Sequence, residues 1–115
     1  MHRLRKLVNG RTVACLAHGD SIREFAARAE EFADLDFCYA SLNYFRVMEE
    51  RLLAKMGREL DLVLCTSEEE TVKRLDDLEA FLGRAPEKLL ITTPLAMQGL
   101  GAFVARYRDQ VLLIE

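Results

Sequence analysis

Short apolar runs and longer amphipathic stretches alternate along the chain. Between the apolar runs, apolar side chains recur every three or four positions, which is the spacing of one face of a helix. Leu62 to Cys65 are consecutive apolar residues, a pattern typical of a strand that is covered on both faces. The pattern therefore predicts the order βαβαβαβαβ. The predicted strands lie at residues 11–17, 35–40, 60–65, 88–92 and 111–114.

Capping residues mark where the predicted helices begin. Residues 21–24 (SIRE) and 67–70 (SEEE) both fit the capping box, in which a serine hydroxyl accepts a hydrogen bond from the N–H three residues later. Thr93 precedes Pro94, and proline suits the first position of a helix because its missing N–H costs nothing there. We expect two of the helices to end at Gly57 and Gly83, and the last to run over 95–107.

Strands that are joined by helices of this length run parallel, through right-handed crossovers. The expected fold is therefore α/β: a three-layer α/β/α Rossmann-like sandwich, with helices on both faces of a mostly parallel sheet of about five strands. Residues 1–115 form one domain, since domains commonly contain about 100–150 residues. The chain finishes on the apolar run 111–114, so this strand lies at an edge or the chain is the N-terminal part of a longer protein; we favour the longer protein.

Composition and charge narrow the class of protein. Apolar residues make up 50% and charged residues 30%, as is usual for a globular domain. The net charge of −3 lacks the basic footprint of a protein that tracks nucleic acid, so we expect no nucleic acid partner. No apolar run approaches the roughly 20 residues of a membrane span, and the run after the basic start is too short for a signal peptide. We therefore expect a cytoplasmic protein.

The first eleven residues are rich in basic side chains. They are expected to form a solvated, partly frayed terminus, or else a surface that contacts an anionic partner. Cys15, Cys38 and Cys65 are well separated and lie in apolar runs, where a free cysteine acts as a small hydrophobe. The chain has no CxxC pair and no His/Cys cluster, so the sequence predicts neither a metal site nor a dithiol, and it indicates no cofactor.

Parallel sheets bind ligands beyond the carboxyl ends of their strands, where the strand order reverses. Three loops are then candidates for a site: residues 17–21, 40–44 and 92–95, the last of which contains Thr93. The sequence lacks both GxGxxG and GxxxxGK[ST], which removes the dinucleotide fingerprint and the P-loop. A binding site here must therefore be built from other residues.

The first of these loops holds most of the candidate residues. Gly19 permits close approach of the backbone, and the N–H groups at Ser21 suit an anion. Asp20 repels phosphate unless it points away or holds a ribose hydroxyl or a metal. His18 is a candidate ligand contact or acid/base, or else a polar surface residue. The alternative for Asp20 and Ser21 is that they only cap a helix.

Asn43 follows the second predicted strand. Its amide either caps the next helix or points at a base or sugar in the cleft. At these residues the chain resembles the nucleotide-binding half of bacterial lipooligosaccharide sialyltransferases, and the related 6-hydroxymethylpterin pyrophosphokinase-like proteins. Those families have a first turn of the form G-N-G-P-S-L, where residues 17–22 read AHGDSI. The sialyltransferases end their second strand R-C-N-Q-F, where residues 41–45 read SLNYF.

The resemblance covers about residues 11–67, including a helix, the glycine Gly57 and the apolar run that follows it. It implies a Rossmann-like donor-binding domain in which His18, Gly19, Ser21 and Asn43 contact a nucleotide such as CMP or a nucleotide-sugar. The turn departs from the family pattern at three of its positions, residues 17, 18 and 20. No histidine occurs after His18 to supply the base of such transferases, so the resemblance implies binding without catalysis.

A second hypothesis is a non-catalytic α/β module with a regulatory or protein-interaction role. It predicts an empty cleft and an apolar surface near the last strand, used to form a homo-oligomer or to contact a downstream domain. The low content of acid/base residues in the candidate loops favours this module. The strand–turn–helix pattern at residues 12–22 favours the nucleotide-binding domain.

Overall fold

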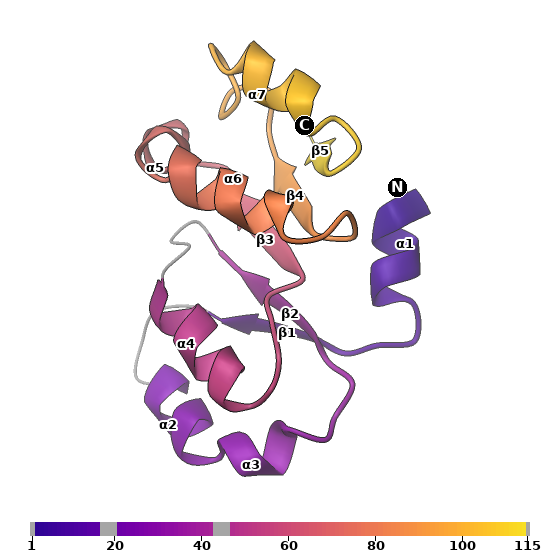
Figure 1. Ribbon diagram of the computed structural model, residues 1–115, viewed down its shortest axis with the longest axis vertical. Helices are drawn as coiled ribbons and strands as arrows, with labels where there is room; N and C mark the ends of the chain where they lie inside the picture. The colour runs from indigo at the N-terminus through magenta and orange to yellow at the C-terminus, as the bar shows by residue number, and fades with distance from the viewer. Residues whose placement is uncertain (1, 17–20, 43–46, 115) are drawn as a thin grey trace.

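The computed structural model describes residues 2–16, 21–42 and 47–114 (Figure 1). Its centre is a sheet of five parallel strands in the order β1-β2-β3-β4-β5, which confirms the predicted α/β class. The chain enters the sheet at one edge and crosses it one strand at a time. The strands are β1 (Val13–Leu16), β2 (Cys38–Ser41), β3 (Leu62–Cys65), β4 (Leu89–Thr92) and β5 (Val111–Leu113).

Helices cover both faces of the sheet, as predicted. Those between strands form one layer, and α1, which precedes β1, forms the other. The described helices are α1 (His2–Val8), α2 (Ser21–Ala27), α3 (Ala29–Phe32), α4 (Val47–Lys55), α5 (Glu68–Lys73), α6 (Leu75–Gly83) and α7 (Gly101–Arg106).

The main core lies between the sheet and the helices that connect its strands. Each connection moves to the next strand in the same direction, and right-handed crossovers then place all connecting helices on one face. Leu53 from α4, Phe81 from α6 and Phe103 from α7 are buried there. They pack with one alternate set of strand side chains, which includes Leu16, Tyr39, Val63 and Leu90.

The opposite face of the sheet is covered by α1. Leu4 and Leu7 lie three residues apart on this helix and pack against the other alternate set of strand side chains: Ala40, Leu62, Leu89 and Ile91. The expectation of a frayed terminus was wrong, because the segment is an ordered helix, whereas its basic side chains Arg3, Arg5 and Lys6 are exposed to solvent as expected. The strands are apolar on both faces, so the face that receives no crossover helix needs this helix to exclude water.

Three of the predicted helices are interrupted or shortened. The helix expected after the first strand breaks at Arg28 into α2 and α3. The segment 67–83 begins as predicted, with Ser67 Oγ accepting a hydrogen bond from Glu70 N at 3.3 Å, but it breaks into α5 and α6 at Arg74. The segment 95–107 is helical only from Gly101. Gly99 has φ +80°, a left-handed conformation that ends regular α-helix, so the turns before α7 replace the first half of the predicted helix.

Gln110 joins several elements where β5 begins. Its side-chain Nε2 lies 2.9 Å from Leu82 O, 2.9 Å from Ala85 O and 3.0 Å from Lys88 O. These carbonyls belong to the end of α6, the loop after it and the start of β4. One side-chain amide therefore links three backbone acceptors around the last crossover, of which Ala85 O also accepts a hydrogen bond from Lys88 N.

We predict that Leu7→Ala lowers the free energy of unfolding by about 1–2 kcal/mol, because it uncovers apolar sheet surface and leaves a gap under α1. The matched control is Lys6→Ala on the exposed side of the same helix, for which we expect a change within about 0.5 kcal/mol. Urea unfolding followed by circular dichroism measures both. Equal effects of the two substitutions would show that α1 does not cover the sheet.

We also predict that Gln110→Ala lowers the free energy of unfolding by about 1–3 kcal/mol, since it removes the hydrogen bonds from this side chain to backbone carbonyls around β4 and β5. Gln98→Ala, at an exposed position before α7, serves as the control and is expected to be neutral. The same urea titration compares the two. An unchanged free energy of unfolding in the Gln110→Ala variant would mean that water replaces the hydrogen bonds of the amide without loss of stability.

Candidate functional site

The loops after β1 and β2 start side by side at the carboxyl edge of the sheet. The two strands are parallel neighbours, and their last residues, Leu16 and Ser41, are partners in the register. The loop residues predicted to bind a ligand, His18, Gly19, Asp20 and Asn43, lie outside the described residues. Ser21 is described as the first residue of α2, which agrees with the predicted helix start.

Thr93 lies elsewhere on the same edge. Its Oγ1 accepts a hydrogen bond from Ala96 N at 3.1 Å, so it caps a turn. The sequence predicted that Thr93 caps a helix, which is wrong, because α7 begins only at Gly101. The strand before it, β4, is three positions from β1, which places Thr93 about 14 Å from the end of β1. The sheet therefore brings the first two candidate loops together and leaves the third apart.

The expected reversal of strand order is absent. The order β1-β2-β3-β4-β5 is strictly sequential, and a reversal requires the chain to leave one edge and return on the other side of its first strand. A crevice at a topological switch point, as in doubly wound folds, therefore does not form in this sheet. Any ligand at the carboxyl edge must bind between loops of neighbouring strands.

The opposite, amino edge of the sheet has a polar cavity of about 530 Å³. It lies where β2, β3 and β4 begin, against the C-terminal end of α4. Cationic and anionic side chains line it in equal number, together with two aromatic rings. The lining residues are Arg11, Phe37, Tyr39, Ala54, Gly57, Arg58, Glu59, Asp61, Glu87 and Lys88.

The end of α4 places Arg58 in this cavity. Gly57, with φ +70°, donates to Ala54 O at 3.0 Å, and Arg58 N donates to Leu53 O at 2.8 Å. This pair of bonds is a Schellman motif, in which a glycine in the left-handed conformation reverses the chain after a helix. The guanidinium of Arg58 then donates from Nε and Nη2 to Ala33 O, which fixes the side chain against the segment after α3.

Asp61 and Tyr39 hold the starts of β3 and β2 together. Asp61 N donates to Tyr39 O at 2.9 Å, and Tyr39 N donates to the Asp61 carboxylate at 3.0 Å. Arg11 adds a third element, since its Nη2 donates to Phe37 O at 2.8 Å and lies 3.9 Å from the same carboxylate. The side of the cavity formed by the strands is therefore fixed by one backbone–backbone hydrogen bond and by the side chains of Asp61 and Arg11.

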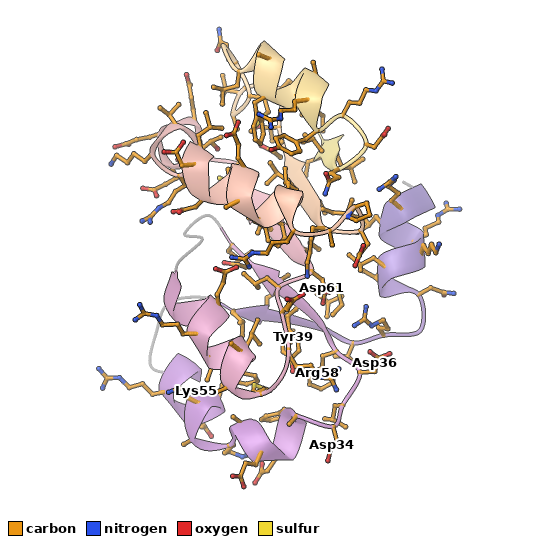
Figure 2. The ribbon with its side chains drawn as sticks, in the orientation of Figure 1. Asp34, Asp36, Tyr39, Lys55, Arg58 and Asp61 are labelled. Atoms are coloured by element: carbon orange, nitrogen blue, oxygen red, sulfur yellow. The ribbon has the colours of Figure 1, made fainter. Side chains whose placement is uncertain are left out.

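The side chain of Tyr39 is 1% exposed and packs edge-on against the rings of Phe25 and Phe37. Its hydroxyl is buried and has no hydrogen-bond partner among the described residues. Burial raises the pKa of this phenol, and the Asp61 carboxylate raises it further, while the Arg58 guanidinium lowers it. Tyr39 is therefore a neutral O–H donor at physiological pH. Figure 2 shows Tyr39, Arg58 and Asp61 close to one another.

Most charges around the cavity are paired. Lys88, almost fully buried, donates from Nζ to Leu60 O at 2.6 Å and pairs with Glu59 at 3.2 Å. Arg11 pairs with Asp36 at 3.2 Å. Within the described part of the chain, no acid forms an ion pair with Arg58. The cavity thus holds one cation whose charge is not balanced by a direct contact.

A cavity with a buried hydroxyl and an unpaired cation can bind a polar ligand.

The described residues contain no group of three or more His, Cys, Asp and Glu side chains that could hold a metal ion. None of the helices described is long and apolar enough to cross a membrane. The chain matches no family model, no curated protein and no solved structure with which it was compared.

Sequence reasoning did not find the amino-edge cavity. The predicted site residues all follow the carboxyl ends of strands, where parallel sheets usually bind ligands. Two local signals were present: an arginine directly after the helix-ending Gly57, and Asp61 directly before an apolar strand. Neither signal indicates that these side chains meet Tyr39, because that contact depends on the register between β2 and β3.

The cysteines differ in exposure, and their reactivity should differ with it. Burial, followed by the Asp61 carboxylate, raises the pKa of Cys38 to about 11, and burial also raises the pKa of Cys65, whereas Cys15 is exposed. We predict that iodoacetamide at pH 8 modifies Cys15 alone in the folded protein, because thiolates react and buried thiols stay protonated. Peptide mass spectrometry identifies the site. The control is unfolded protein, in which every cysteine should be labelled. Fast labelling of Cys38 in the folded protein would contradict its burial.

Proposed function

We propose that this chain is a nucleotide- or nucleotide-sugar-binding domain of a transferase-like protein, and that it is not catalytic by itself. The binding residues in this proposal are His18, Gly19, Ser21 and Asn43. The observation that supports it is the pairing of Leu16 with Ser41, since this register starts both binding loops at adjacent points of one edge. A ligand that spans two neighbouring loops needs no reversal of strand order.

In this proposal the first loop takes the phosphate or ribose and the second takes the base or sugar. Gly19 gives the ligand access to backbone N–H groups, and the amide of Asn43 can both donate and accept a hydrogen bond. Thr93 was a further candidate from the sequence. Because β4 lies three positions from β1, Thr93 could contact only the far end of an extended nucleotide-sugar.

One observation favours the second candidate function, a protein-interaction module. Leu113 at the end of β5 is 44% exposed, and Ile114 directly after it is 42% exposed. β5 pairs with β4 on one side only, so its outer side is an edge of the sheet. An edge strand with exposed apolar side chains can be covered by another chain or by a second copy.

We expect calorimetric titration of the full chain with CMP and a CMP-sugar to show saturable binding. Asn43→Ala and Ser21→Ala should each weaken it by about tenfold, the effect of losing one net hydrogen bond. Asn9→Ala, at an exposed position after α1, is the matched control and should bind like the unaltered chain.

Two results would refute the nucleotide proposal: no heat of binding at millimolar ligand, or variants indistinguishable from the unaltered chain. Light scattering then tests the alternative. The interaction module predicts self-association that Leu113→Ser abolishes, whereas a monomer at every concentration counts against a homo-oligomer.

A further inference from the structure

The amino-edge cavity contains two buried donors that the protein does not use. The hydroxyl of Tyr39 and Nε of Arg11 both lack a hydrogen-bond partner within the described residues. Leaving a buried polar group unpaired is costly, so a buried donor without a partner beside a cavity is available to an acceptor that enters the cavity. Both residues line the same cavity, together with Arg58.

Three carboxylates also line the cavity, but the buried groups without a partner are donors, and these indicate which ligand atom can bind beside them. Within the cavity, a phenol O–H, a guanidinium N–H and the unpaired charge of Arg58 all seek an acceptor, and an acceptor that carries negative charge forms the strongest hydrogen bonds. A cation is excluded from this part of the cavity, because it would lie beside two guanidinium groups. The complementary group is therefore an oxyanion.

We propose that this cavity binds a small organic monocarboxylate, whose oxygens accept hydrogen bonds from Tyr39 and Arg58. The site is separate from the carboxyl-edge loops of the proposed nucleotide site, since it lies at the opposite ends of the strands.

The unpaired cation beside Tyr39 favours a ligand with a single negative charge over one with two. Arg58 is one cation without a paired acid, while Arg11 and Lys88 already pair with acids. A dianion such as phosphate would bring a second negative charge close to Asp61 and to Glu87 at the exposed rim, which raises its free energy. A volume of about 530 Å³ leaves room for the organic part of the ligand beside Phe37 and Ala54.

The test is a titration of the full chain, observed through backbone amide signals by nuclear magnetic resonance, with propionate, benzoate and inorganic phosphate as probes. We expect the carboxylates to shift the amides of Tyr39, Arg58 and Asp61 in a saturable way. Phosphate should bind more weakly. The amides of residues 101–106, in α7, should not respond.

Tyr39→Phe separates binding from folding, because it removes only the unpaired hydroxyl. We expect its melting temperature to equal or exceed that of the unaltered chain, and its carboxylate affinity to fall at least fivefold. Tyr107→Phe, on the turn after α7, is the matched control and should bind normally. Glu87→Gln should bind more tightly, since it removes the acid at the rim.

Three results would overturn the proposal. The carboxylates could produce no saturable shift at tens of millimolar, Tyr39→Phe could bind as well as the unaltered chain, or phosphate could bind more tightly than the carboxylates. A nucleotide that fails to bind at the carboxyl edge bears on none of these outcomes, so the two sites are tested independently.

Discussion

The right-handed crossover between neighbouring parallel strands is the constraint on which the rest of this structure depends. Each connection moves one strand further in the same direction, so every connecting helix packs on one face of the sheet. The opposite face is equally apolar and receives no helix from within the sheet. Helix α1 must cover it, and a topological switch point cannot arise, because the strand order never reverses.

The need to cover the second face explains how the basic N-terminal segment is held. Leu4 and Leu7 are partly buried against the sheet, while the basic side chains of Arg3, Arg5 and Lys6 are exposed. Arg11 then ties the end of α1 to the start of β2, by donating to Leu7 O and to Phe37 O. The same side chain borders the amino-edge cavity, so the covering of one face and the wall of the cavity depend on one residue.

The two edges of the sheet have different chemistry. At the carboxyl edge, two loops begin at adjacent strands and carry the small and polar residues of the proposed nucleotide site. At the amino edge, hydrogen bonds between Tyr39 and Asp61 fix the wall of a cavity that Arg58 also lines, and the buried hydroxyl of Tyr39 has no partner among the described residues.

Local pattern was enough to predict the α/β class, the five parallel strands, the cap at Ser67 and the helix end at Gly57, because each depends on residues within one turn or one strand. Tertiary structure decided the strand order, the role of α1 and the break at Gly99. It also decided the meeting of Tyr39 with Arg58 and Asp61, residues about 20 positions apart. Their contact depends on strand register and on the turn after α4, and pairing between distant segments leaves no periodic signal in a single sequence.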